Sequence, residues 1–203
     1  MKKAVLSFAA AMLLAAPAVR AQYTDNDFTP YHNVEIGTGI VSIPFFAMTL
    51  GVVFGTAFSL GHFTVEDMYS TSALSAEYYY NFNPHVAVGG AAVFEYFGGD
   101  TYTKNSSTDE YEISGKYSGI FTSLMPAARF GWFSRDHFMM YSKVAAGGML
   151  SDTGSGEDSS PQFTFAFQAS PVCLSAGGGH CWGKLELGFG MMGLVQAGFV
   201  YRF

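Results

Sequence analysis

The sequence predicts an antiparallel, up-and-down β-barrel of eight strands that crosses the outer membrane of a Gram-negative bacterium. Charged residues make up only 13% of the chain, whereas aromatic residues reach 17% and glycine occurs 24 times. Soluble domains usually carry about 25% charged residues. Segments with an apolar residue at every second position recur along the chain, and short connections alternate with long ones. Together these features are typical of barrels that face lipid.

The first 21 residues have the three-part order of a secretory signal peptide. Lys2 and Lys3 form a positive start, an apolar stretch too short to span a bilayer follows, and the letters VRA precede Gln22. We therefore expect residues 1–21 to be removed on export. Residues 22–32 would then form a periplasmic leader. A buried N-terminal helix is the alternative interpretation of residues 1–21.

Eight segments alternate as a strand does when one face meets lipid and the other meets a small interior. They are residues 33–41, 71–82, 85–97, 116–133, 137–150, 161–174, 182–190 and 193–203. In the first segment, Val34 and Ile36 alternate with Glu35 and Gly37. A soluble sandwich also alternates, but its outer face would be charged and its loops would not segregate by length.

The connections differ in length on the two sides of the predicted barrel. The short ones are residues 83–84, 134–136 and 175–181; separately, residues 191–193 join the last two segments in a tight hairpin. The long ones, predicted to be outer loops, are residues 42–70, 98–114 and 151–160. Their acidic residues are Glu66, Asp67, Asp100, Asp109, Glu110, Glu112, Asp152, Glu157 and Asp158. We expect these carboxylates to keep the loops solvated; divalent-cation bridges to lipopolysaccharide phosphates are the alternative.

The alternation sends eight charged side chains toward the barrel interior, four acidic and four basic. They are Glu35, Glu77, Glu95, Arg129, Lys143, Lys184, Glu186 and Arg202. Buried charges are costly unless they are paired and hydrogen-bonded, and the interior of eight strands is just filled by side chains. The balanced set therefore predicts a network of salt bridges that plugs the lumen. A path for protons or ions is the alternative.

Residues 43–60 carry no charge over 18 positions, which is close to the length of a membrane-spanning helix. Pro44 and several Gly, Thr and Ser residues lower the propensity of this segment to insert into a membrane as a helix. The segment also fits strand alternation. A ninth strand would break the even number that such barrels favour. We expect an apolar helix or hairpin in the first outer loop, packed on the barrel rim or the lipid interface. Alternatives are a first strand here, with residues 33–41 as a leader, or a tenth strand near residues 62–70.

The two cysteines, Cys173 and Cys181, flank a glycine-rich turn. In the oxidising compartment that an exported chain reaches, this spacing predicts a disulfide across the turn. Free thiols are the alternative. A metal site with His180 would remain incomplete, because two Cys and one His supply only three ligands. We expect no metal and no cofactor.

Four stretches of sequence carry a resemblance to a known group: SLMPAARFGWF, MMYSKVAAGG, FAFQASPVCL and LELGFGMMGLVQAGFVYRF. They resemble the small outer-membrane β-barrel proteins of Bacteroidetes-type bacteria and, more distantly, the eight-stranded barrels OmpA and OmpX. The resemblance covers residues 33–203 and is strongest from residue 123 onward, whereas residues 42–70 and the cysteines depart from the pattern. It implies that the last strand carries the signal read by the barrel-assembly machinery: Val195, Ala197, Phe199, Tyr201 and Phe203.

Some outer-membrane barrels are lipid-modifying enzymes or proteases, and their chemistry needs a Ser–His–acid set or paired Asp and His at the outer rim. Four histidines lie before the first strand or at the short turns, which is the wrong end for outer-leaflet lipid: His32, His85, His137 and His180. Only His62 falls in a long loop, near Ser59 and Asp67. We therefore expect no enzyme, and a lipase-like site at His62 is the version that remains to be tested.

The sequence thus predicts a plugged outer-membrane barrel with a structural or surface-interaction role. The expected partners are outer-membrane lipid, lipopolysaccharide, the barrel-assembly machinery during biogenesis and an unidentified extracellular ligand. Three of the 10 Lys and Arg lie in the first 21 residues and all 16 Asp and Glu lie beyond, so the exported chain has a net charge of −9. This balance argues against nucleic acid as a partner. A narrow channel or a transporter of small hydrophobic ligands is the alternative function.

Overall fold

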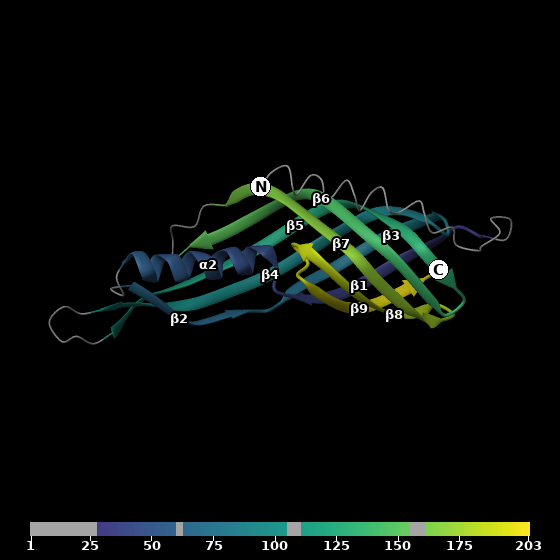
Figure 1. Ribbon diagram of the computed structural model, residues 1–203. Coiled ribbons are helices and arrows are strands. Elements are labelled where there is room, and N and C mark those ends of the chain that lie inside the picture. The colour runs from purple at the N-terminus through teal and green to yellow at the C-terminus, as the bar shows by residue number, and fades with distance from the viewer. Residues whose placement is uncertain (1–27, 60–62, 105–110, 155–160) are drawn as a thin grey trace, which may run out of the picture.

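Eight antiparallel strands of the chain close into a barrel (Figure 1). The computed structural model describes residues 28–59, 63–104, 111–154 and 161–203, so the predicted signal peptide lies outside the described residues. The elements are β1 (Tyr31–Ile40), α2 (Ile43–Phe58), β2 (Phe63–Ser70), β3 (Ala73–Asn83), β4 (Val86–Lys104), β5 (Tyr111–Arg135), β6 (Phe138–Gly154), β7 (Gln162–Gly178), β8 (Cys181–Gly190) and β9 (Val195–Arg202).

Hydrogen bonding joins the strands in the order β2-β4-β3-β1-β9-β8-β7-β6-β5, and β4 also pairs with β5. This last pairing closes a ring of eight strands, β1 and β3 to β9, whereas β2 lies outside the ring. β1 pairs antiparallel with both β3 and β9, so strands from the two ends of the described chain are neighbours. The predicted eight-stranded antiparallel barrel is confirmed.

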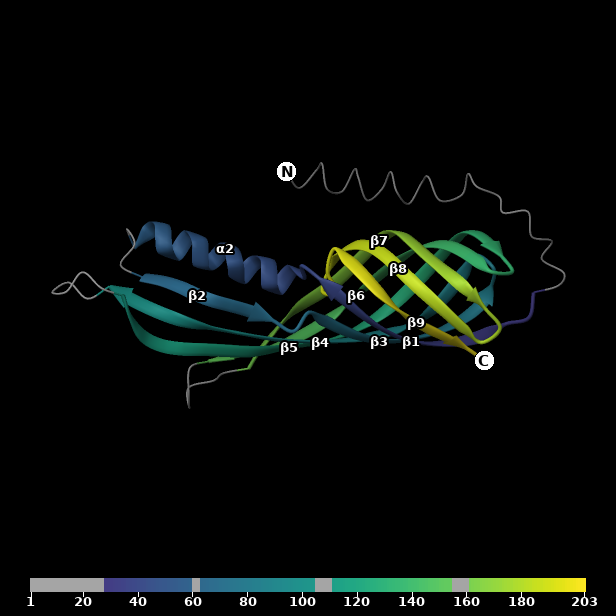
Figure 2. The same cartoon turned by 90° about the horizontal axis from the view of Figure 1, so that it is seen from below.

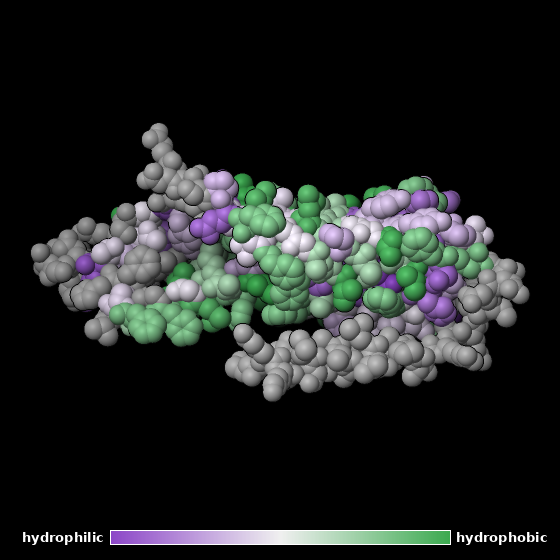
Figure 3. Space-filling view, turned by 90° about the horizontal axis from the view of Figure 1, so that it is seen from above, coloured by the Kyte–Doolittle hydropathy of each residue, from purple (hydrophilic) through white to green (hydrophobic). Residues whose placement is uncertain are grey.

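Side chains alternate between the barrel interior and its outer wall, as the two-residue period of a strand requires. On β7, Ala166, Gln168 and Ser170 are buried, whereas Phe163 and Phe165 are 75% and 67% exposed. Apolar side chains gather over the middle of the barrel wall in the space-filling view (Figure 3). The barrel therefore buries small, polar and charged residues and presents large apolar residues outward.

The barrel wall is much longer on one side than on the other (Figure 2). β4, β5 and β6 contain 19, 25 and 17 residues, whereas β8 and β9 contain 10 and 8. β2 pairs with the far part of β4, from Phe63 opposite Thr103 to Ser70 opposite Phe97. Along the near part of β4, from Val86 to Phe94, the same edge pairs with β3 instead. The long strands thus form a wall that projects beyond the closed ring.

This projecting wall corrects the predicted loops at residues 98–114 and 151–160. β4 and β5 remain paired as far as Lys104 opposite Tyr111, and β6 continues to Gly154. Residues 105–110 and 155–160 lie outside the described residues. The sequence here is polar, so it lacks the apolar alternation of a lipid-facing strand. Backbone pairing across a ladder does not need that alternation.

Helix α2 and strand β2 account for most of the predicted first loop, residues 42–70. The expected apolar helix is confirmed for Ile43–Phe58, and β2 coincides with the alternative of a further strand near residues 62–70. Ser42 begins the helix, because its Oγ accepts a hydrogen bond from the backbone N–H of Phe45 at 3.3 Å. Pro44 lies in the first turn, where its missing N–H is not needed. Among the described residues, no helix is both long and apolar enough to cross a bilayer.

The short turns lie close to their predicted positions. Between β3 and β4, the side-chain Oδ1 of Asn83 accepts hydrogen bonds from the backbone N–H groups of His85 and Val86, both at 2.8 Å. Between β7 and β8, the predicted connection 175–181 shrinks to Gly179 and His180, because β7 continues to Gly178. Gly179 has a φ of +57°, which glycine adopts without a steric penalty.

Candidate functional site

Six charged side chains from five strands meet inside the barrel, and all are at most 5% exposed. The acidic ones come from β1, β3 and β8, and the basic ones from β5, β6 and β8. They are Glu35, Glu77, Glu186, Arg129, Lys143 and Lys184. We call these six residues the lumen network. Strand alternation alone places each of them on the interior face.

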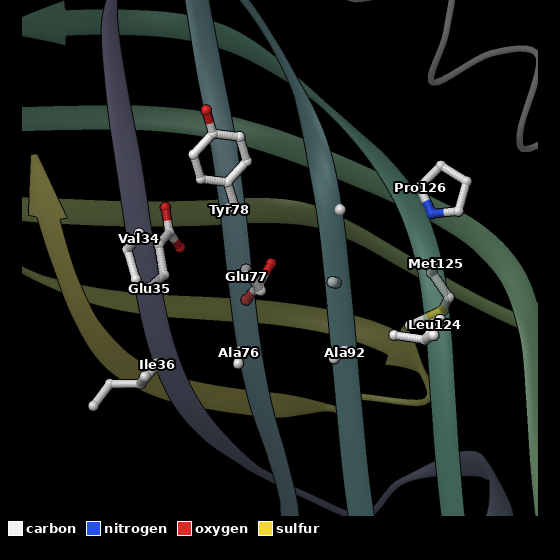
Figure 4. Close-up of a pocket in the computed structure, with 12 residues that line it drawn as sticks. Val34, Glu35, Ile36, Ala76, Glu77, Tyr78, Ala92, Leu124, Met125 and Pro126 are labelled. Atoms are coloured by element: carbon white, nitrogen blue, oxygen red, sulfur yellow. The ribbon is translucent and has the colours of Figure 1, made fainter.

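Arg129 and Lys184 join the glutamates of neighbouring strands. The guanidinium of Arg129 faces the carboxylate of Glu35 with both terminal nitrogens, and Nη2 donates to Oε2 at 2.6 Å. Lys184 Nζ lies 2.9 Å from Glu35 Oε2 and also forms a salt bridge with Glu77. Glu35 and Glu77 lie next to each other on β1 and β3 (Figure 4). Two like charges are therefore held together by two cations.

Lys143 completes the lumen network on its other side. Its Nζ lies 3.0 Å from Glu77 Oε2 and forms a salt bridge with Glu186. Two buried tyrosines add hydrogen bonds: Tyr79 donates to Glu77 at 2.9 Å and Tyr141 donates to Glu186 at 2.7 Å. Three carboxylates thus face three cations, so the formal charge of the lumen network is zero.

Aromatic rings hold the arginine of the lumen network in place. The guanidinium carbon of Arg129 lies 3.6 Å from the ring centre of Tyr79 and 4.7 Å from that of Tyr141. Cation–π contacts of this kind stabilise a desolvated guanidinium. Both tyrosines fall on the inward positions of their strands. The alternation could therefore have identified them, although it does not show which charges they contact.

The three glutamates of the lumen network bring carboxylate oxygens within 4.8 Å of one another, a spacing that could hold a metal ion. Each of these carboxylates, however, already forms a salt bridge with at least one cation of the lumen network. A divalent ion would have to displace buried ammonium groups, which would then be left unpaired at a large cost. The donor set therefore fits a salt-bridge network and not a metal centre.

The other two predicted lumen charges, Glu95 and Arg202, lie apart from the lumen network. Glu95 is buried on β4, and its carboxylate accepts hydrogen bonds from Ser42 Oγ at 2.5 Å and Ser70 Oγ at 2.7 Å. Arg202 is half-buried, and its guanidinium carbon lies 3.4 Å from the ring centre of Trp182. Alternation predicts the face on which a side chain lies but not its height, by which we mean its position along the barrel axis.

The turn between β8 and β9 folds into one mouth of the barrel. Met191 and Met192 are 4% and 0% exposed, and the backbone N–H of Met192 donates to Gln168 Oε1 at 2.8 Å. Lys143 Nζ lies 3.3 Å from the sulfur of Met192. Gly193 has a φ of +92°, which permits the reversal of the chain. This turn and the lumen network thus both lie inside the ring, in contact with each other through Lys143 and Met192.

The cysteine prediction is corrected, because both cysteines are free thiols. Cys173 lies opposite Glu186, whereas Cys181 lies opposite Gly178, five residues away along the same strand. Five residues of strand span roughly 16 Å, and a disulfide requires Cα atoms within about 7 Å. Cys173 is buried and Cys181 is exposed. A turn of only two residues leaves the cysteines at different heights.

The histidines do not form a catalytic set among the described residues, and His62 lies outside them. The other four lie at the short-turn end of the barrel. Each ring Nδ1 contacts one oxygen: His32 with Tyr78 Oη at 2.6 Å, His85 with the Gly131 carbonyl at 3.3 Å, His137 with the Gly177 carbonyl at 3.0 Å and His180 with the Arg202 carbonyl at 2.6 Å. Each of these contacts links a histidine to another strand of the barrel.

The predicted assembly residues all lie on β9 or directly after it, on the outer wall: Val195, Ala197, Phe199, Tyr201 and Phe203.

Close to the lumen glutamates, the outer wall holds an apolar groove of about 530 Å³ over β1, β3, β4 and β5. Ala76 and Ala92 form its floor, and larger side chains such as Ile36 and Leu124 stand beside it (Figure 4). The groove is thus part of the apolar exterior.

Comparison with known proteins identifies no family for this chain. No protein-family model and no curated protein matches this sequence. The assignment therefore rests on the chain's own features: a closed eight-stranded β-barrel with a buried salt-bridge network inside.

Proposed function

We propose that the chain is a plugged outer-membrane barrel with a structural or surface-interaction role. The observation that carries this proposal is the combination of an apolar outer wall with a lumen filled by paired charges. In the proposed orientation, the short turns face the periplasm. The projecting wall of β2, β4, β5 and β6, together with α2, then faces the outside and provides the interaction surface.

The apolar outer wall supports a lipid environment. Large apolar side chains of the barrel strands stand exposed around the ring, among them Val34, Ile36, Leu74, Val88, Leu124, Val144, Leu185, Leu187, Val195 and Phe199. Monomeric soluble proteins rarely expose contiguous apolar patches of more than a few hundred Å². Leaving one such side chain in water forgoes about 1.5–3 kcal/mol relative to burying it. A bilayer around the wall removes that cost.

Aromatic rings at both ends of the wall support the same proposal. At the short-turn end, Phe203 stacks on His32 at 5.6 Å and lies 6.1 Å from Tyr201, measured between ring centres. At the other end of β7, Phe165 and Phe167 have ring centres 6.3 Å apart. Outer-membrane barrels carry aromatic girdles at both interfaces of the bilayer. Rings at the two ends of the apolar wall are what such girdles require.

The filled lumen argues against the channel alternative. A water-filled path would have to pass the lumen network and the Met191–Met192 turn, whose side chains are almost completely buried. A selective pore also needs a net field, and three carboxylates against three cations provide none. We therefore favour a closed barrel over a narrow channel. Outer-membrane lipid, lipopolysaccharide and the barrel-assembly machinery remain the proposed partners.

Two measurements test this proposal. In detergent gels, the unboiled protein should migrate differently from the boiled protein, because a closed membrane barrel resists the detergent. In planar bilayers, the folded protein should give no discrete openings. A variant that removes part of the plug, Lys143→Ala, should give openings, whereas Lys116→Ala should not, because Lys116 is exposed and remote from the lumen network.

The outcomes separate the candidate functions. Equal migration of boiled and unboiled samples contradicts the membrane barrel itself. Discrete openings in the unmodified protein contradict the plug and favour the channel. Silence in both the unmodified protein and Lys116→Ala, together with openings in Lys143→Ala, supports the closed barrel.

A further inference from the structure

An apolar cavity of about 330 Å³ lies between the first half of helix α2 and the mouth of the barrel. Ile43, Pro44 and Met48 line it from the helix. Strands β5, β6 and β7 line it from the barrel, with side chains such as Phe121 and Met149. We call this space the mouth cavity. Its volume is at the lower end of the range of ligand pockets, about 300–1,000 Å³.

The lining of the mouth cavity is almost entirely apolar. Among the described residues, Thr164 is the one polar residue that lines it, and none of the lining residues is ionisable. Three of them are methionines, Met48, Met149 and Met191. Methionine is flexible and polarizable, so such a wall adapts to the shape of an apolar occupant. The cavity therefore favours an uncharged, apolar ligand.

The mouth cavity has a closed inner end and an open rim. Pro44 and Met191 are buried at its inner end, whereas Ala47, Thr164 and Phe165 are exposed. Phe165 belongs to the row of phenylalanines on the outer wall, where its ring lies 6.3 Å from that of Phe167. The rim of the cavity is thus continuous with the surface that we propose to face lipid.

We propose that the mouth cavity binds the end of one aliphatic acyl chain from the lipid around the barrel. This inference rests on the membrane barrel proposed above and adds a ligand to it. A peptide segment fits less well, because its backbone N–H and C=O groups would find only the Thr164 hydroxyl as a side-chain partner and burying them unpaired is costly. The buried Met191 and Met192 close the lumen beyond the cavity, so the chain end is held and not passed through.

A photoreactive fatty acid tests this proposal. The folded protein is placed in phosphatidylcholine nanodiscs with palmitic acid that carries a diazirine at its chain end. After irradiation, mass spectrometry locates the labelled residues. We expect the label to concentrate on residues 43–48 and 164–167. The variant Ala47→Trp, which fills the rim, should lower this labelling by about fourfold for each methylene that it keeps out of the cavity.

A matched variant controls for changes in the helix surface. Ala57 lies on the same helix, is also exposed and does not line the mouth cavity, so Ala57→Trp should leave the labelling unchanged. Each variant is first checked for heat-modifiable migration, which shows that the barrel has formed. Unlabelled palmitate should compete for the concentrated label.

Three results would overturn the inference. The label could spread evenly over outer-wall residues such as Leu187 and Val195, it could persist in Ala47→Trp, or palmitate could fail to compete. Each of these would show only general contact with lipid. A protein that fails to enter nanodiscs contradicts the membrane barrel instead, so the two proposals fail in distinguishable ways.

Discussion

Glu35 and Glu77 lie directly opposite each other across β1 and β3, and both are buried. Like charges in this position destabilise a pair of strands. Lys184 forms salt bridges with both, and Arg129 approaches both, so each carboxylate is shared between cations. The β1–β3 register therefore depends on side chains that come from β5 and β8.

Removing Lys184 should destabilise the barrel strongly. In Lys184→Met the apolar stem of the side chain is kept, but Glu35 and Glu77 lose the ammonium between them. Loss of one partner from a buried pair costs about 3–5 kcal/mol. We expect a lower midpoint of urea unfolding in lipid vesicles, followed by the gel shift of the folded barrel. Lys116→Met is the control, because an exposed ion pair contributes about 0–1 kcal/mol. Equal midpoints for both variants would contradict the account.

The carboxylate of Glu95 should hold the start of helix α2. It accepts hydrogen bonds from Ser42, which precedes the helix, and from Ser70 at the end of β2. Glu95→Ala leaves both hydroxyls without this acceptor, a cost of about 1–3 kcal/mol where they stay buried. We expect faster amide hydrogen exchange in residues 43–58, with the ring of eight strands unchanged.

A control for this second prediction removes a single hydrogen bond elsewhere. Ser142 donates to the carbonyl of Pro171 on the barrel wall at 2.7 Å. Ser142→Ala should leave exchange in residues 43–58 as it is in the unmodified protein. If Glu95→Ala also leaves it unchanged, the contact between Glu95 and Ser42 does not anchor the helix.

Gly39 should be needed for the inward turn between β8 and β9. A Cβ atom at residue 39 would lie 1.8 Å from the carbonyl oxygen of Met192, so Gly39→Ala must push the turn out of the mouth. At Gly183 a Cβ atom would meet nothing nearer than 3.8 Å, which makes Gly183→Ala the matched control. We expect a lower melting temperature by circular dichroism for Gly39→Ala only. Similar melting of the two variants would show that the turn tolerates displacement.

Deleting Phe203 should lower assembly into the outer membrane. Its backbone exchanges two hydrogen bonds with His32, at 2.9 and 3.0 Å, and its ring stacks on the His32 ring. The deletion removes these contacts at the closing strand pair and the proposed assembly signal. We expect a smaller heat-modifiable fraction in membrane extracts, and Phe203→Tyr should restore most of it. Normal assembly of the truncated chain would count against the signal.

The sequence predicts the ring of strands well, because each barrel strand has one face toward the interior and one toward the outside. That period placed Glu35, Lys143 and Glu186 on the interior side. It carries no information on height, which is why Glu95 and Arg202 could not be separated from the others. The heights follow from strand register, and register depends on partners far away in the chain.

The projecting wall and the helix were harder to predict, for a different physical reason. Residues 98–104 and 111–118 are mostly polar and contain several glycines, and their strand structure comes from pairing with each other. Residues 43–58 fit both a helix and a strand by apolar content alone. What favours the helix locally is the Ser42 cap and a proline in the first turn.

The pairing of β1 with β9 limits how fast the barrel can fold. Val34 lies opposite Tyr201, so the seam joins segments that are far apart along the polypeptide. Contacts of such long range delay folding, because the entropy of closing the loop is lost before they form. Until the seam closes, both edge strands expose unpaired backbone groups that invite aggregation. A chain truncated before β9 would therefore form an open sheet with two unpaired edges, prone to aggregation, and not a smaller closed barrel.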